Sequence, residues 1–388
     1  MEIREFYDEN LADYQRMSSY LFHSPTSDEA IEKAAQGEEK KEDFIRIGAF
    51  SDRLLAAIEI YPYTVMFEDK PIKMGGIGRV VSAHEARGTG AVKKIFAEGF
   101  RLMREHGQFI SHLFPFRGDY YRIYGYEVSA ENVVWEIPCE YIKNDKIGTI
   151  KYFDGSEKMK ADIVGIYHKF IRGRNLVLAD KKWESFFEAR KPYTSKLFSY
   201  VHYTDGAADG FVSYKMQPYA EKTQDIVTEN FWYADRNGIA GLMGYFAGLK
   251  EYADKCIVCC NDDLSSFAEF NGGWGKKDTE RKVHFWGSTR IVDVEKILEL
   301  KGFDGAFSLK ITDEYCPWNN AVFTVKNGKV EKSDDGEYDA AMSIRAFSSL
   351  ILGRYDNPLL VRETEFVKNY ETLKRLFAKK IIFFDEHF

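Results

Sequence analysis

The chain has little proline, few cysteines and no long apolar run. Its 388 residues include 9 prolines and 5 cysteines, which disfavours both long unstructured linkers and a disulfide framework. No stretch approaches the ~20 apolar residues of a membrane-spanning helix, and the start Met1-Glu-Ile-Arg-Glu lacks the character of a signal peptide. We therefore expect a cytoplasmic protein without a membrane span, whose cysteines are reduced.

An excess of basic charge is also lacking. Lys and Arg number 54 against 61 Asp and Glu, a net charge of −7, whereas a nucleic-acid-binding domain needs a basic face. We expect no nucleic-acid partner. The acidic balance suits a cationic substrate but is also common in cytosolic proteins. The length exceeds what one hydrophobic core organises, so we expect two or three domains.

Three of the cysteines lie in KCIVCC (255–260), whose C-x-x-C spacing occurs in zinc sites. A second Cys or His pair does not follow at ligand spacing in the sequence. We interpret this segment as a buried strand that uses cysteine as a small apolar residue, and we expect no metal.

The order of apolar patterns indicates an α/β (α+β) protein. In the first part of the chain we predict helices at 5–21, 27–37, 90–107 and 118–124, and strands at 44–50, 54–67, 72–83, 109–116 and 126–137. A similar order recurs to about residue 285. After it, Asn327-Gly328 separates two alternating runs, which is a strong hairpin signal. The pattern predicts domains at 1–140, 141–285 and 286–388.

The segment VVSAHEARGTGAVKKIF (80–96) carries the first chemical signal. A strand ends at Ser82, a tight loop follows at Arg87-Gly88-Thr89-Gly90, and a helix begins at once. The start of a helix presents free N–H groups and partial positive charge, and glycine lets a phosphate approach the backbone. The loop predicts an anion site, although such a motif alone is weak evidence.

The segment LFPFRGDYYRIYGYE (113–127) strengthens this reading. The order strand, R-x-x-G loop, helix, strand and Y-x-x-x-G resembles the GCN5-related N-acetyltransferases. The resemblance implies acetyl-CoA as acyl donor and Tyr121 as the acid that protonates the departing thiolate, since a phenol pKa of about 10 is close to that of a thiol. The implied donor-binding residues are Val80, Val81, Ser82, Arg87, Gly88, Thr89, Gly90, Ala91, Val92 and Lys93.

Other side chains near these motifs leave alternatives open. Spacing to Gly125 favours Tyr121 over its neighbours Tyr120, Tyr124 and Tyr126. His84 and His112 are interpreted as structural, because neither has a positioned partner motif. We predict Phe116 as a wall of the site and Arg117 as a contact to a phosphate of the donor. Where the family pattern has a second basic residue, this chain has Thr89.

The chain resembles the Eis (enhanced intracellular survival) acetyltransferases over essentially its whole length. The most specific parts of this resemblance are RIVDVEK (290–296), ITDEY-x-PWNN (311–320), the Asn-Gly hairpin and the aromatic ending. The resemblance implies two GCN5-related acetyltransferase-like domains, the second degenerate, followed by a sterol-carrier-protein-like α/β domain. It also implies a homo-oligomer, a hexamer, that acetylates amines of polycationic small molecules such as aminoglycosides or polyamines.

The ending IIFFDEHF (381–388) has two readings. By pattern alone it is a last edge strand whose terminus packs. The resemblance to Eis proteins instead implies that the terminal carboxylate of Phe388 is the general base. Two alternatives stay open for the whole chain: a non-catalytic protein that binds coenzyme A or a lipid, and a tandem acyltransferase that uses a longer acyl donor.

Overall fold

The computed structural model describes residues 1–7, 10–23, 26–35, 44–144, 146–220, 223–262, 279–354, 358–384 and 386. The chain divides into two compact units. Unit 1 contains Met1–Ala130, Trp286–Lys380 and, farther along, Phe384 and Glu386. Unit 2 contains Glu131–Phe285 and Ile381–Phe383. The three predicted domains, 1–140, 141–285 and 286–388, stay a prediction.

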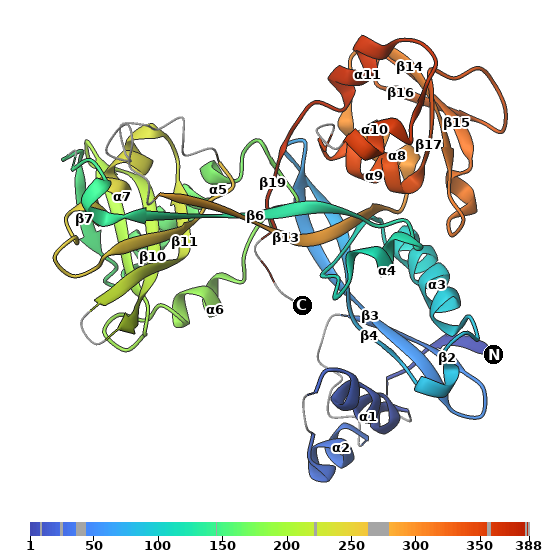
Figure 1. The fold of residues 1–388 in the computed structure, drawn as a ribbon, viewed down its shortest axis with the longest axis horizontal. Coiled ribbons are helices and arrows are strands. Elements are labelled where there is room, and N and C mark those ends of the chain that lie inside the picture. The colour runs from blue at the N-terminus through green and yellow to red at the C-terminus, as the bar shows by residue number, and fades with distance from the viewer. Residues whose placement is uncertain are drawn as a thin grey trace. The chain divides into compact units, whose positions relative to one another are not determined.

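The first part of unit 1 is built on a mixed sheet with strand order β1-β2-β3-β4-β5-β13 (Figure 1). Its elements are β1 (Glu2–Glu5), α1 (Leu11–Leu21), α2 (Asp28–Ala35), β2 (Ile45–Phe50), β3 (Leu54–Phe67), β4 (Lys70–Ser82), a 3-10 turn (His84–Ala86), α3 (Ala91–Glu105), β5 (Gln108–Leu113), α4 (Gly118–Arg122) and β6 (Glu127–Pro138). Strands β1 to β4 are antiparallel neighbours. Helix α3 then crosses over, so that β5 lies parallel to β4, and β13 pairs antiparallel with β5.

Opposite faces of this sheet carry different helices, because successive strand residues point to opposite sides. Ile58 of β3 belongs to the buried cluster that includes Phe96 of α3. Its neighbour Glu59 belongs to the other face, where the guanidinium of Arg46 lies over the ring of Tyr14 from α1. Helix α3 therefore packs on one face, and α1 packs on the other.

The predicted elements of this region are confirmed except at its start. Residues 5–10 were expected to be helical, but Glu2–Glu5 is a strand and the helix begins at Leu11. The strand wins because its backbone groups pair with β2, with Ile3 opposite Ala49. The helix that follows Ser27 is confirmed with its cap, since the Ala30 N–H donates to Ser27 Oγ at 3.2 Å.

Unit 2 repeats the strand and helix order of unit 1. Its elements are a 3-10 turn (Cys139–Tyr141), β7 (Thr149–Tyr152), α5 (Glu157–Phe170), β8 (Arg174–Asn175), α6 (Trp183–Glu188), β9 (Phe198–Thr204), β10 (Ala207–Ala220), β11 (Thr223–Tyr233), α7 (Arg236–Ala247), β12 (Lys255–Cys259), the start of β13 (Glu280–Ile291) and β19 (Ile381–Ile382). The strand order is β6-β12-β11-β10-β9-β7. Strands β9 to β11 are antiparallel, α7 crosses over, and β12 lies parallel to β11.

The KCIVCC segment is confirmed as a buried strand of unit 2. Cys256 and Val258 belong to its core cluster, together with Ile239 and Phe246 of α7. In the described ranges, no group of three or more His, Cys, Asp or Glu side chains is placed to hold a metal ion. The described helices also include none that is both long enough and apolar enough to span a membrane.

The last part of unit 1 is a second, smaller sheet with order β16-β15-β14-β17-β18. Its elements are α8 (Val294–Lys301), β14 (Ala306–Thr312), a 3-10 turn (Pro317–Asn319), β15 (Ala321–Lys326), β16 (Lys329–Ser333), β17 (Ala340–Ser343), α9 (Ile344–Ile351), α10 (Pro358–Arg362), β18 (Glu365–Phe366) and α11 (Tyr370–Leu376). The predicted hairpin is confirmed: Asn327 and Gly328 have φ of 50° and 75°, as a tight β-turn with two left-handed residues requires.

Candidate active site

Strand β4 of unit 1 continues past the end of its parallel neighbour β5. Within the residues that the structure describes, the β4–β5 register ends at Gly76 opposite His112, while β4 continues to Ser82. Beyond that pair, residues 77–82 present a strand edge that β5 does not cover. We call the space beside this uncovered edge the gap between β4 and β5. In α/β sheets, ligands bind outside the carboxyl ends of parallel strands, and an extended ligand can add to such an edge as another strand. The predicted residues Val80, Val81 and Ser82 lie on this stretch.

A bulge bends β4 at the same place. Gly78 lies opposite Glu59 and Val81 opposite Ala57, so Arg79 and Val80 together face one residue of β3. Arg79 has φ of 45°, which is the left-handed region and costs energy for a residue with a side chain. Its Nε lies 3.8 Å from Oε2 of the buried Glu59. The strand edge is therefore held in shape from the α1 face by an ion pair.

The gap leads to the start of α3. Gly90 is the N-cap residue, with φ of 78°, and a side chain added there would meet nothing within 4 Å. The first backbone hydrogen bond of the helix runs from the Lys94 N–H to the Gly90 carbonyl at 3.1 Å. The N–H groups before Lys94 have no carbonyl within the helix, although that of Ala91 lies 3.4 Å from Thr89 Oγ1. This is the geometry of an anion site.

Two of the basic side chains expected to hold phosphate are paired with carboxylates. The Lys93 ammonium forms an ion pair with Glu314, which raises the pKa of Lys93. The Arg117 guanidinium pairs with Asp119 at 2.6 Å and is exposed. Arg87 is exposed at the loop itself. Arg87 and the backbone N–H groups therefore remain at the anion site, whereas Lys93 and Arg117 are each already paired with a carboxylate.

Tyr121 lies in α4, inside the apolar cluster on the α3 face. The cluster also contains Ala91, with Val80 and Val92 packed against it, so the structure brings three donor-binding candidates to the same cluster as the acid candidate. The side chain of Tyr121 is 5% exposed. Burial, with a contribution from Tyr120, raises the pKa of Tyr121, so the phenol is protonated at neutral pH.

The competing tyrosines have other engagements. The hydroxyl of Tyr126 hydrogen-bonds with Ser111 Oγ at 2.6 Å. The ring of Tyr124 stacks on Phe96 at 4.2 Å.

Phe116 is 71% exposed, and its ring contacts Tyr121 edge-on at 5.8 Å. This fits a wall beside Tyr121.

His112 closes the last strand pair and is fully buried. Its Nδ1 hydrogen-bonds with Thr289 Oγ1 at 2.9 Å. Burial lowers the pKa of His112 to about 3, so it is neutral and not poised to exchange protons at neutral pH. His84, the other predicted structural histidine, packs edge-on against Tyr20 at 5.0 Å.

The C-terminal segment reaches the strand where the gap opens. The buried ring of Phe384 packs against His112 at 4.7 Å, Tyr63 at 5.9 Å and Phe114 at 6.0 Å. Burial, with the charge of Glu386, raises the pKa of Tyr63 to about 12, so an acidic residue of this segment lies near β3. Phe388 itself lies outside the described residues.

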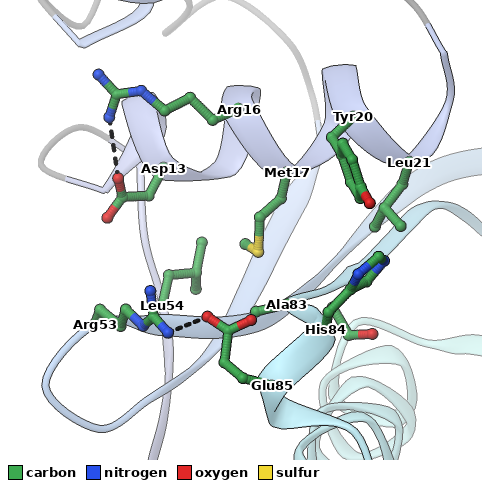
Figure 2. A pocket seen from close by; sticks show the side chains of 11 residues that line it. Asp13, Arg16, Met17, Tyr20, Leu21, Arg53, Leu54, Ala83, His84 and Glu85 are labelled. Atoms are coloured by element: carbon green, nitrogen blue, oxygen red, sulfur yellow. Dashed lines mark hydrogen bonds and ion pairs between the residues drawn. The ribbon is translucent and has the colours of Figure 1, made fainter.

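A pocket of about 370 Å³ adjoins the end of β4 on the α1 face (Figure 2). It is lined by Asp13, Arg16, Met17, Tyr20, Leu21, Arg53, Leu54, Ser82, Ala83, His84 and Glu85. As Figure 2 shows, its charged side chains pair with one another, Arg16 with Asp13 and Arg53 with Glu85. The pocket shares Ser82 with the strand edge, and its paired charges do not favour a ligand of either sign.

Sequence reasoning missed Arg79, Glu59 and Phe384. The run MGGIGR (74–79) carried a signal for the bulge, because glycine inside a strand pattern marks bulges and close backbone approach. The ion pair of Glu59 with Arg46 depends on the register of the neighbouring strands β2 and β3. The packing of Phe384 on His112 joins segments that are far apart in sequence, and no local pattern indicates it.

The comparisons with known proteins agree with this geometry. Residues 2–129 match the family described as "Acetyltransferase (GNAT) domain", and residues 294–384 match "Sterol carrier protein domain". No curated protein matches the chain.

Solved structures share the fold along the whole chain. A probable N-acyltransferase from Enterococcus faecalis has 21% identity and a TM-score of 0.79, covering 100% of this chain and 99% of its own. Eis1 from Mycobacterium abscessus has 16% identity and a TM-score of 0.77, with 100% of both chains covered. A GCN5-related N-acetyltransferase from Anabaena variabilis has 19% identity, a TM-score of 0.77 and the same coverage.

These matches define the class: the chain is an N-acetyltransferase with a GNAT domain at its start and a sterol carrier protein domain at its end. The predicted mixed α/β fold with these domains is confirmed. Along its whole length the chain shares the fold of Eis1.

Proposed function

We propose that the chain transfers an acetyl group from acetyl-CoA to an amine of a polycationic small molecule, aminoglycoside-like or polyamine-like. The observation that supports this most directly is the gap between β4 and β5, which leads to the start of α3. A strand edge suits the amide-rich pantetheine arm, and a helix start suits the pyrophosphate.

The donor is held mainly by backbone. Val80, Val81 and Ser82 offer peptide groups to the pantetheine arm. Gly88 and residues 90–93 offer N–H groups to the pyrophosphate, whereas the Thr89 N–H donates to the Ala86 carbonyl. Arg87 supplies the nearest positive charge that the loop presents. Lys93 adds charge while remaining paired with Glu314.

Tyr121 acts as the general acid. The amine nitrogen attacks the thioester carbonyl carbon, the C–S bond breaks, and the sulfur takes the proton of the Tyr121 hydroxyl. The proton that the nitrogen loses on forming the amide restores that hydroxyl through water. Because burial raises the pKa of Tyr121, the hydroxyl carries its proton when it is needed.

The terminal carboxylate of Phe388 acts as the general base that takes a proton from the substrate ammonium and so frees the amine nitrogen to attack. The packing of Phe384 beside His112 supports this role, since it holds the nearby segment at the opening of the gap. A terminal carboxyl has an ordinary pKa of about 3.5, so partial burial must raise it or water must relay the proton. Carboxylates of the last residues favour a cationic acceptor.

From the resemblance to Eis proteins, we also propose a cytoplasmic hexamer. Unit 1 supplies all of these site residues that the structure describes.

The test is release of free coenzyme A from acetyl-CoA and longer acyl-CoAs, with a panel of polyamines and aminoglycosides. Protein with an N-terminal tag, with a C-terminal extension and with Phe388 deleted is compared, each checked for native mass by light scattering. We expect acetyl transfer by the N-tagged protein and loss of turnover in the other two. Deletion moves the carboxylate by about 3.3 Å, beyond hydrogen-bond tolerance. Full activity of a correctly assembled C-extended protein would falsify the terminal base, and no coenzyme A release with any amine would refute the transferase.

A further inference from the structure

Two sequence motifs that the active site leaves unexplained meet in a buried cluster of unit 1. Arg290 of RIVDVEK is fully buried, and its guanidinium donates to both carboxylate oxygens of Asp313, at 2.7 and 2.6 Å. Asp313 belongs to ITDEY-x-PWNN, whose Asn319 donates to the same carboxylate at 2.9 Å. Asn319 Oδ1 in turn accepts from the Val294 N–H at 3.0 Å. The cluster joins the strand β13 to the sterol carrier protein domain.

The same guanidinium reaches the turn that follows Tyr121. Another nitrogen of Arg290 donates to the Tyr124 carbonyl, and the guanidinium carbon lies 4.0 Å from the centre of the Phe100 ring. Gly125 has φ of 83°, and a Cβ there would lie 2.7 Å from Arg290 Nη1. The turn therefore needs glycine both for its backbone conformation and for the approach of this arginine.

A second arginine, from the sterol carrier protein domain itself, reaches the last residue of the turn. Arg345 of α9 donates to Oε2 of the buried Glu127 at 2.6 Å. The other oxygen of Glu127 accepts from Arg122, the residue next to Tyr121, at 2.9 Å. The other terminal nitrogen of Arg345, Nη2, forms an ion pair with Glu363.

The turn also closes on Tyr121 itself. The N–H groups of Tyr124 and Tyr126 both donate to the Tyr121 carbonyl, at 3.0 and 3.3 Å. A shift of Tyr124 is therefore transmitted to Tyr121 through this hydrogen bond. A shift of Glu127 is transmitted through its ion pair with Arg122, the next residue along the chain.

We infer that Arg290 and Arg345 are positioning residues, and that the sterol carrier protein domain clamps the Tyr121 turn (residues 118–127) in its catalytic geometry. The clamp rests on the proposed role of Tyr121. Arginine suits it because its rigid fork serves two acceptors in fixed directions, which lysine does not. An error of about 1 Å in the place of a catalytic group can cost on the order of a hundredfold in rate.

The test uses the full chain with Arg345→Gln, Arg290→Lys, Tyr121→Phe and the double variant Arg345→Gln/Tyr121→Phe. Arg104→Gln is the matched control, because Arg104 of α3 also pairs with a residue of the C-terminal part, Asp293 at 2.7 Å, but does not touch the turn. Steady-state kinetics with acetyl-CoA and the most active polyamine give kcat and KM. Hydrogen exchange of residues 118–127 reports the order of the turn without relying on activity.

We expect Arg345→Gln and Arg290→Lys to lower kcat about tenfold or more, to leave the KM of acetyl-CoA within about threefold, and to speed exchange of the turn. The double variant should fall no more than about twofold below Tyr121→Phe, because the clamp acts through that hydroxyl. Arg104→Gln should change neither kcat nor exchange of the turn.

The outcomes separate the two proposals. If Tyr121→Phe keeps its rate, the acid role fails, and with it the catalytic purpose of the clamp. If Tyr121→Phe is slow but Arg345→Gln lowers kcat by the same factor in both backgrounds, the acid role stands and the clamp is overturned. Unchanged exchange of the turn in Arg345→Gln overturns the clamp even in a protein without measurable turnover. Should Arg290→Lys fail to fold, Arg345→Gln, whose side chain is 23% exposed, decides alone.

Discussion

The crossover helices of the two units begin in opposite ways. In unit 1, α3 begins after Gly90, which offers no side chain to its first N–H groups. In unit 2, α7 begins after Asp235, whose carboxylate accepts from the N–H groups of Asn237 and Gly238 at 2.9 and 3.1 Å. The place that would hold an external anion in unit 1 is filled in unit 2 by the chain itself.

The parallel strands differ in the same sense. Beyond Gly76 and His112, β4 continues past its last pair with β5. In unit 2, β11 and β12 pair at Val227 and Ile257, and Thr228 extends the contact: its hydroxyl donates to the Ile257 carbonyl at 3.2 Å and accepts from the Cys259 N–H at 3.3 Å. A side chain thus bridges the strands where unit 1 has a gap.

The bulge, by contrast, is common to both units. In unit 2 the β10–β11 register shifts between Ser213 and Tyr214, which leaves Glu229 as the extra residue of β11. The bulged, crossed-over sheet is therefore a scaffold common to both units. Among the described residues, unit 1 alone combines an open helix start with an open strand edge, and the proposed donor site rests on these two features.

The largest expected effect tests whether the chemistry is confined to unit 1. Tyr121→Phe keeps the ring and removes the hydroxyl, and because a positioned acid contributes about 10²–10⁴-fold, kcat should fall by that factor while acetyl-CoA still binds. The matched control is Tyr245→Phe in unit 2, whose hydroxyl hydrogen-bonds to that of Tyr214 at 2.8 Å. Its kcat should stay within about twofold of the parent. A fast Tyr121→Phe variant would transfer the acid role to Tyr120 or to water.

The next effect comes from giving α3 the cap that α7 has. Gly90→Asp places a carboxylate at the helix start, and loss of one charge-assisted contact is worth about 1.5–3 kcal/mol, with repulsion in addition. Coenzyme A affinity should therefore fall at least about tenfold, measured by calorimetric titration. Gly90→Asn is the matched control, since it has the same shape and tolerates left-handed backbone, and it should bind more tightly than Gly90→Asp. Equal, parental affinities in both variants would remove the loop from the site.

Much of this site was readable in the sequence because its parts are local. The strand end, the R-G-T-G loop and the helix start lie within residues 80–94, and turn chemistry and helix periodicity predict each of them. The strand at Glu2–Glu5 was missed because its partner, β2, lies some forty residues farther on, and pairing overrode the local preference.

The rest of the site could not be read because it is made by distant segments. Arg290 reaches Tyr124 across 166 positions of sequence, and Lys93 reaches Glu314 across 221. A single chain pattern carries no information on which charges pair after folding. The motifs RIVDVEK and ITDEY-x-PWNN stood out in the sequence, but the pairing of Arg290 with Asp313 and the contact of Arg290 with Tyr124 required the structure.

A third effect sets one buried histidine of each unit against the other. Burial lowers the pKa of His112 to about 3, so its contribution to stability is present above the unfolded pKa of about 6.5 and is lost as the pH falls below it, by up to about 1.4 kcal/mol per pH unit. In unit 2, the pKa of His202 is raised. Burial acts to lower it, but the hydrogen bonds to Asp209, at 2.6 Å, and to the Ile147 carbonyl outweigh burial. Its contribution is therefore present below about 6.5 and is lost as the pH rises through the folded pKa.

Chemical denaturation of the parent, His112→Asn and His202→Asn at pH 5, 6, 7 and 8 measures this difference, because these values lie on both sides of the unfolded histidine pKa of about 6.5. His112→Asn should weaken the dependence of unfolding free energy on pH between about 6.5 and 5. His202→Asn should leave that acidic range unchanged and should remove the part of the stability loss that the parent shows as the pH rises above about 6.5. Identical pH profiles of all three proteins would contradict the opposite assignments.

The smallest effect removes the internal cap of unit 2. Asp235→Ala leaves the first N–H groups of α7 without their carboxylate, and loss of such a cap costs about 0.5–2 kcal/mol of unfolding free energy. The first N–H groups of α7 are already hydrogen-bonded to Asp235, so we expect acetyl-CoA not to bind there. The KM of acetyl-CoA should therefore stay within about twofold of the parent. Asp235→Asn is the matched control: asparagine also caps helices well, so most of the lost stability should return. Urea denaturation gives the stability and steady-state kinetics the KM. A variant that is as stable as the parent would show that the cap of α7 is not needed, whereas a large change in the KM would show that the second helix start takes part in donor binding and that the two units are not divided into a site and a scaffold.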